Sequence, residues 1–187
     1  MELQHLNVKF FVAQPQAVDL EPLLAVFNAW IQEGATDELL VDVADYRHVP
    51  AGPGVVLIGH EANYSLDIAE NRPGVLYNRK APLPGTNQQR LRQAVRAALL
   101  AVERLGRRPG LQFTGTGLQL TVNDRLLAPN TEETLESARP DLTLFFDQLY
   151  GPDRYSLERH VEPRERFTLD VRAEGPRDMA ALLSSVS

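Results

Sequence analysis

The chain has 187 residues, of which 43% are hydrophobic and 24% are charged, and it contains no cysteine. This length suits one domain or two small ones, the composition excludes wholesale disorder, and the missing cysteine excludes disulfide frameworks, thiolate zinc sites and cysteine nucleophiles. No stretch reaches the roughly 18 apolar residues of a membrane span, and residues 1–5 lack the pattern of a secretory signal. We therefore expect a cytoplasmic protein without a membrane partner.

Charge is distributed unevenly, although the formal net charge is only −6. Between Lys9 and Arg47 there are seven acidic residues and no Lys or Arg, whereas residues 73–110 carry eight basic residues and one acidic residue. Two interpretations remain open. Either the acidic and basic elements face each other, within the chain or across a homodimer, or the basic part binds nucleic acid or an anionic ligand.

The first elements are a strand and a helix. Apolar residues alternate with polar ones over residues 5–12, which predicts a half-buried strand. Apolar residues at spacings of three and four then predict a helix over residues 19–33. Asp19 is its expected N-cap, and Gly34 is a plausible residue to end it.

A hairpin is predicted over residues 39–68. Residues 39–49 and 55–68 have the character of strands, and the segment between them is rich in Pro and Gly. If the turn spans residues 50–54, Ala44 faces His60. A short strand over residues 75–79 follows.

A long helix over residues 86–105 has an apolar stripe and an Arg-rich outer face. Beyond residue 110 we predict strands, a helix from about residue 131 that is interrupted at Pro140, a hairpin over residues 154–173 and a short C-terminal helix. Residues 1–110 and 111–187 form two similar units that are expected to share one core. The predicted class is α+β, with a mainly antiparallel sheet, helices largely on one face and a ferredoxin-like (βαββαβ) N-terminal part.

The densest polar cluster is expected in the predicted hairpin. Facing strands would place His60 beside Asp42 and Tyr46, where a carboxylate and a phenol next to an imidazole can perform acid–base catalysis. The alternative is a structural histidine whose hydrogen bonds are satisfied inside a sheet. A bulge at Gly59 would separate the three residues.

Other motifs have little specificity. The four histidines show no metal-binding spacing, and Gly115-Thr116-Gly117 lacks the third glycine and the helix of a dinucleotide-binding loop. We therefore predict no metal and no cofactor.

A ligand site for a phosphate or carboxylate is predicted around the start of the basic helix. Its candidate residues are His48, Asn63, Tyr77, Asn78, Arg79, Lys80, Arg92 and Arg96. The alternative is a solvated basic face paired with the acidic helix. The pI near 5.2 disfavours nucleic acid as a partner.

Three functional hypotheses follow from these observations. The first is a self-associating, non-enzymatic protein, expected to be a dimer, that binds a small anionic ligand or a protein partner in a cleft bordered by residues 39–68 and 77–80. The second is an enzyme that uses His60 with Asp42 or Tyr46. The third is binding of RNA or another anion by the basic helix over residues 86–108.

Overall fold

The computed structural model describes residues 1–50, 52–162 and 164–187. These residues form an α+β fold with one eight-stranded antiparallel sheet in the order β2-β3-β4-β5-β1-β6-β8-β7. The strands are β1 (Leu6–Phe11), β2 (Leu40–Tyr46), β3 (Gly54–Gly59), β4 (Ala62–Asp67), β5 (Gly74–Arg79), β6 (Gly117–Val122), β7 (Tyr155–Arg159) and β8 (Phe167–Ala173).

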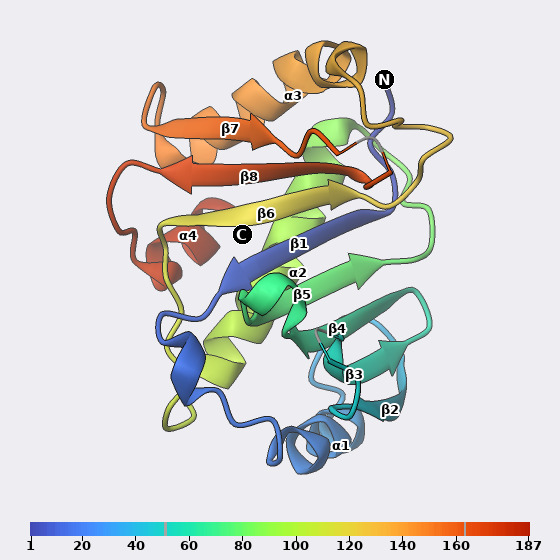
Figure 1. Ribbon diagram of the computed structural model, residues 1–187, viewed down its shortest axis with the longest axis vertical. Coiled ribbons are helices and arrows are strands. Elements are labelled where there is room, and N and C mark those ends of the chain that lie inside the picture. Colours follow the sequence, from blue (N-terminus) through green and yellow to red (C-terminus); the bar gives the residue numbers. More distant parts are fainter. Residues whose placement is uncertain (51, 163) are drawn as a thin grey trace.

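The α-helices of the described chain lie on one face of this sheet (Figure 1). They are α1 (Leu23–Glu33), α2 (Asn87–Gly106), α3 (Glu132–Tyr150) and α4 (Met179–Ser185). α2 crosses the centre of the sheet behind β1 and β5, α1 covers β2 and β3, and α3 lies beside β7. The predicted antiparallel sheet with helices on one face is confirmed.

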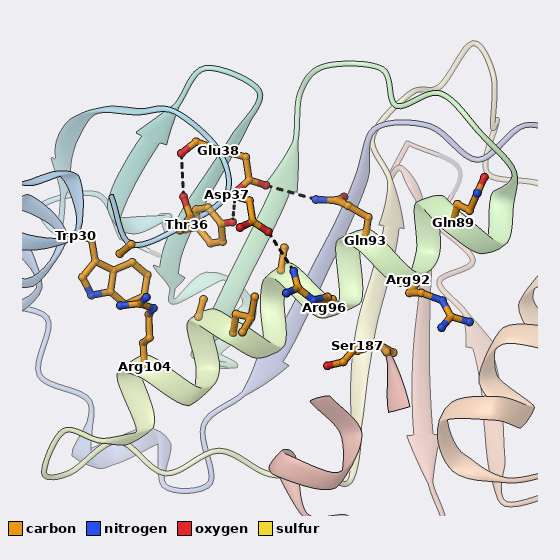
Figure 2. A pocket seen from close by; sticks show the side chains of 16 residues that line it. Trp30, Thr36, Asp37, Glu38, Gln89, Arg92, Gln93, Arg96, Arg104 and Ser187 are labelled. Atoms are coloured by element: carbon orange, nitrogen blue, oxygen red, sulfur yellow. Dashed lines mark hydrogen bonds and ion pairs between the residues drawn. The ribbon is translucent and has the colours of Figure 1, made fainter. Parts of the chain in front are cut away.

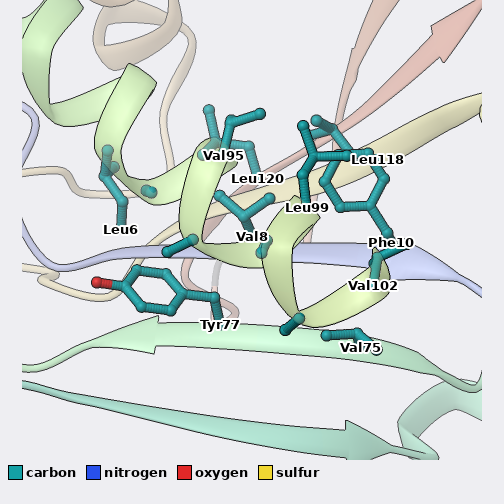
Figure 3. Close-up of a cluster of buried hydrophobic side chains, with 14 of the residues drawn as sticks. Leu6, Val8, Phe10, Val75, Tyr77, Val95, Leu99, Val102, Leu118 and Leu120 are labelled. Atoms are coloured by element: carbon teal, nitrogen blue, oxygen red, sulfur yellow. The ribbon is translucent and has the colours of Figure 1, made fainter. Parts of the chain in front are cut away.

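The centre of the core lies between α2 and the central strands. Figure 3 shows Val95, Leu99 and Val102 of α2 packed over Val8 of β1 and Tyr77 of β5, and all five are almost fully buried. The apolar stripe of α2 therefore faces the sheet, and its polar side faces away. At the N-terminus of α2, Thr86 and Gln89 form a reciprocal capping box.

Two helix predictions need correction. α1 begins at Leu23, and the Asp19 carboxylate instead accepts a hydrogen bond from the backbone N–H of Glu21. α3 continues through Pro140, because Phe145 and Phe146 beyond it are buried in the core. Gly34 ends α1 in the left-handed conformation, as predicted.

The predicted hairpin over residues 39–68 is wrong in its length and register. Residues 55–68 form two strands joined by a tight turn at His60, and Ala44 faces Val56 rather than His60. β2 is an edge strand. Leu39, which precedes it, is 68% exposed, and Val41 within it is 53% exposed.

The ferredoxin-like order of the N-terminal part is not confirmed. β5 and β6, which precede and follow α2 along the chain, both pair with β1. However, three strands, β3, β4 and β5, lie between β1 and β2 in the sheet. The sheet runs through both predicted units, since β1 of the first unit pairs with β6 of the second. Within the described residues, no helix combines the length and the apolar character needed to cross a membrane.

Candidate functional site

A cavity of about 550 Å³ lies on the helical side of the sheet. Its walls are the end of α1, the connection from α1 to β2, the exposed side of α2 and the last residues of the chain (Figure 2). This volume is in the range of pockets that bind small molecules, which is about 300–1,000 Å³. The cavity is the candidate site of this protein.

Three arginines of α2 line the cavity. Arg92 and Arg96 are one helical turn apart, about 6 Å along the axis, and Arg104 lies two turns beyond Arg96. Residues four apart are neighbours on one side of a helix, whereas Arg104 lies about 80° around the axis from Arg96. The core stripe of α2 faces the sheet, so these guanidinium groups point to the other side, where the cavity opens.

Most of this positive charge has no acidic partner. Among the described residues, the ion pairs of α2 join Arg90 to Glu2, Arg96 to Asp37 and Arg107 to Glu103. The Arg96–Asp37 pair is 3.1 Å long and the Asp37 side chain is 85% exposed, so this pair contributes little stability.

Trp30 forms the apolar end of the cavity. Its side chain is 6% exposed, and the Arg104 guanidinium lies 5.9 Å from the centre of its ring. Leu100 and Ala101 of α2 and Val186 add further apolar surface. The cavity thus has an arginine-rich end and an apolar end with an aromatic ring.

Glu38 is held at the side of the cavity by a hydrogen-bond network. Tyr64 donates to Glu38 Oε2 over 2.6 Å, and Tyr77 donates to Oε1 over 3.0 Å. The Gln93 side-chain amide donates to the Tyr77 hydroxyl over 2.8 Å, and it lies 3.4 Å from Glu38 Oε1. Both tyrosine rings are buried and meet edge to face. This network ties the α1–β2 connection to β4, β5 and α2.

Burial raises the pKa of the Tyr64 hydroxyl well above its usual value of 10, and the neighbouring Glu38 carboxylate raises it further. Burial, followed by the Glu38 charge, also raises the pKa of the Tyr77 hydroxyl. Both hydroxyls are therefore protonated at neutral pH and act as fixed donors. Their role is to hold Glu38 in place.

The structure brings together only some of the residues predicted for ligand binding. Arg92 and Arg96 line the cavity, and Tyr77 contributes its hydroxyl to the network beside it. Asn63 and Asn78 lie opposite each other on the other face of the sheet.

The remaining three predicted ligand residues lie elsewhere. His48 is exposed in the connection from β2 to β3. Arg79 is buried and pairs with Glu61, and the Lys80 ammonium donates to the Gly59 carbonyl. The cavity is therefore not bordered by residues 77–80 as predicted, although Tyr64 of the predicted hairpin lines it.

The predicted catalytic residues are spread along the β2–β3 pair. Asp42 faces Ile58, and Tyr46 faces Gly54 at the opposite end from His60. His60 is six positions beyond Gly54 along the chain, which is about 20 Å in a strand. His60 is exposed in the turn after β3. The structure does not assemble these three side chains into one cluster, and their catalytic role stays a prediction.

The sequence analysis missed several cavity residues. Arg104 continues the four-residue spacing of Arg92 and Arg96 along α2, so a helical projection could have found it. Trp30 and Glu38 meet α2 only through the tertiary fold, and the sequence carries no local signal for them.

Comparisons with known proteins add no functional information. No protein-family model matches the chain, and no curated protein matches it. The functional argument therefore depends on the geometry of the site.

Proposed function

We propose that this protein binds a small amphipathic anion in the cavity between α1 and α2. The observation that carries the proposal is the alignment of Arg92, Arg96 and Arg104 along one side of a 550 Å³ cavity that also contains the buried ring of Trp30. Guanidinium groups pair with carboxylates and phosphates through two parallel hydrogen bonds. Trp30 and Leu100 would contact the apolar part of the same ligand.

The polarity of the cavity sets the orientation of the ligand. Arg92 and Arg96 lie one helical turn apart, with Gln148 3.5 Å from Arg92 and Asp37 3.1 Å from Arg96, and a shared acidic group would take the place of these two partners. Arg104, which lies beside Trp30, is about 12 Å farther along α2. The acidic group would lie near Gln89 and Gln93, and the flat apolar part would extend towards Trp30. An aromatic carboxylate or sulfonate has this combination of features.

The test uses the single tryptophan of the chain. Anilinonaphthalene sulfonate is a flat apolar anion, and when it binds near Trp30 it should accept excitation energy from the indole. We expect Arg92→Glu and Arg96→Glu to weaken its binding about tenfold or more, since a hydrogen bond to a charged group contributes roughly 1.5–3 kcal/mol.

Arg108→Glu is the matched control, because Arg108 is exposed, follows the same helix and does not line the cavity. It makes the same charge change and should leave the affinity as it is. Equal affinities for the wild type, both cavity variants and the control would refute the proposal.

Self-association as a homodimer, a cytoplasmic location and a ferredoxin-like (βαββαβ) arrangement of the N-terminal part remain predictions that accompany this proposal. Light scattering of the purified protein tests the first of them directly. A monomeric mass would refute the prediction of self-association and would leave the proposal for the cavity unchanged.

A further inference from the structure

The face of the sheet opposite the helices carries a continuous polar row. Asn63, Asn78, Asn7, Thr121 and Thr168 belong to β4, β5, β1, β6 and β8, and each lies directly opposite the next. The residues that precede or follow them in each strand are buried in the core on the helical side. Because side chains alternate along a strand, all five members of the row point away from the helices.

The three amide oxygens of this row have no hydrogen-bond donor among the described residues. The Oδ1 atoms of Asn7, Asn63 and Asn78 are buried and accept no hydrogen bond from the described residues. Leaving such a group unpaired is unfavourable, and strand interiors are depleted in asparagine. Three aligned asparagines in the centre of a sheet therefore do not serve stability.

A hollow of about 320 Å³ lies over one end of the row. Asn7, Thr121 and Thr168 form its floor together with Lys9, and the Thr121 and Thr168 hydroxyls are 2.9 Å apart. The segment 164–166 and Arg125 form its walls. Its floor residues point away from the helices, and Figure 1 shows α2 behind β1, β6 and β8. The hollow and the α1–α2 cavity are thus on opposite faces of the sheet.

The walls of the hollow bring three guanidinium groups together, from Arg125, Arg164 and Arg166. None of these three forms an ion pair within the part of the chain that the structure describes, where the ion pairs of the hollow and its rim involve Lys9, Arg72 and His160.

The acidic residues of the hollow lie beside other basic side chains. Asp67 Oδ2 lies 2.5 Å from the buried Lys9 ammonium, and Glu70 lies 3.9 Å from Arg72. Glu165 lies 3.3 Å from His160. None of these carboxylates thus pairs with Arg125, Arg164 or Arg166. The Arg125 guanidinium donates one hydrogen bond to the Arg164 carbonyl, and the side chains of Arg164 and Arg166 have no hydrogen-bond partner among the described residues.

We propose that this hollow binds a phosphorylated, hydroxyl-rich small molecule, of the sugar phosphate class. Arg125, Arg164 and Arg166 supply the fork geometry that matches phosphate oxygens. The amides and hydroxyls of the floor supply the alternating donors and acceptors that match the hydroxyls of a sugar. Leu76 is the apolar member of the lining, so an apolar ligand has little to contact.

Glucose 6-phosphate, glucose and inorganic phosphate are the probes, and isothermal titration calorimetry on the full chain measures their affinities. We expect glucose 6-phosphate to bind more tightly than either of the other two, since each of them engages half of the site. Arg164→Glu and Arg166→Glu should weaken its binding about tenfold or more. The double change Thr121→Val with Thr168→Val, which keeps the shape of the floor, should weaken glucose 6-phosphate but leave inorganic phosphate as it is.

Two controls separate this proposal from the function proposed above. Arg92→Glu removes a guanidinium from the α1–α2 cavity on the other face and should leave glucose 6-phosphate binding unchanged, as should Arg108→Glu. Thermal unfolding of each variant verifies that it is folded. No binding of glucose 6-phosphate at millimolar concentration would overturn the proposal. Equal affinities for glucose 6-phosphate and inorganic phosphate would overturn the assignment to a sugar.

Discussion

The Tyr64 hydroxyl lies 2.6 Å from Glu38 Oε2 and links a buried residue of β4 to the connection between α1 and β2. Tyr77 binds the other oxygen of the same carboxylate. One acidic side chain therefore fixes one wall of the α1–α2 cavity against the sheet, and this wall should move when the carboxylate is lost.

Replacing Glu38 should destabilise the fold through its tyrosine partners. Glu38→Ala leaves the Tyr64 hydroxyl without its acceptor, and an unpaired buried polar group costs about 1–3 kcal/mol. Glu38→Gln keeps one acceptor oxygen and should lower the free energy of unfolding by a smaller amount. Urea unfolding measures both changes. Glu33→Ala, at an exposed position nearby, is the control and should stay within about 0.5 kcal/mol of the wild type. Equal losses for Glu38→Ala and Glu33→Ala would contradict the role of the network.

Stability should fall in alkaline solution. Burial raises the pKa of Tyr64, Tyr77 and Tyr150, and it raises the pKa of Tyr155 to about 12. A tyrosine whose pKa is higher in the folded state stabilises the fold fully below its unfolded value of 10. This contribution is lost as the pH rises from 10 towards the folded pKa.

Two measurements follow this transition. The free energy of unfolding should decline above pH 10, and the decline should be smaller in Tyr64→Phe. The phenolate absorbance of the native protein should lag behind that of the unfolded protein. Coincident titration of native and unfolded tyrosines near pH 10 would contradict the prediction.

Lys9 and Asp67 form an ion pair on the face of the sheet opposite the α-helices. Replacing one of the two residues should destabilise the fold more than replacing both. The two side chains are 4% and 9% exposed, and Lys9 Nζ lies 2.5 Å from Asp67 Oδ2. Lys9→Met leaves a buried carboxylate without its cation, for which about 3–5 kcal/mol of destabilisation is expected. The double variant Lys9→Met with Asp67→Leu should recover most of this loss. Additive losses in chemical unfolding would show that the two side chains are independent.

Gly54 should not tolerate a side chain. Its φ is +68°, and a Cβ atom there would lie 2.3 Å from the carbonyl oxygen of Leu66 in the neighbouring strand. Gly54→Ala should therefore lower the melting temperature clearly more than Gly34→Ala. Gly34 has a φ of +59° but no atom within 4 Å of its Cβ position, so its variant incurs the backbone strain alone. Equal effects of the two substitutions would show that the contact at Gly54 is relieved by a small shift.

Local patterns predicted those elements whose signals agree with their packing. The stripe of α2, its start near residue 86 and the final hairpin follow from periodicity and turn residues alone. The turn at His60 was missed because the sequence from residue 55 to residue 68 continues to look like a strand through it. Pro140 was overrated as a helix breaker, since the burial of Phe145 and Phe146 stabilises α3 on both sides of it.

The candidate site was predicted in part for the same reason. Arg92 and Arg96 belong to one helix, and their spacing alone puts them on a common side. Their partners Trp30 and Glu38 come from segments more than 50 residues away, and only the placement of α1 and α2 on the same face of the sheet brings them to one cavity. Asn63 and Asn78 were predicted as ligand residues without the register that aligns them with Asn7.

The edge position of β2 has a consequence for handling the protein. An unpaired edge with protruding Leu39 and Val41 invites a strand from another molecule, and carboxylates on the same strand discourage such stacking while they are ionised. Arg47 holds the pKa of Asp45 at about 2, so this carboxylate stays ionised in mild acid. The net charge of the whole molecule, in contrast, is zero near pH 5.2. Precipitation should therefore begin close to that pH, and Asp45→Asn should widen the pH range over which fibrous aggregates form.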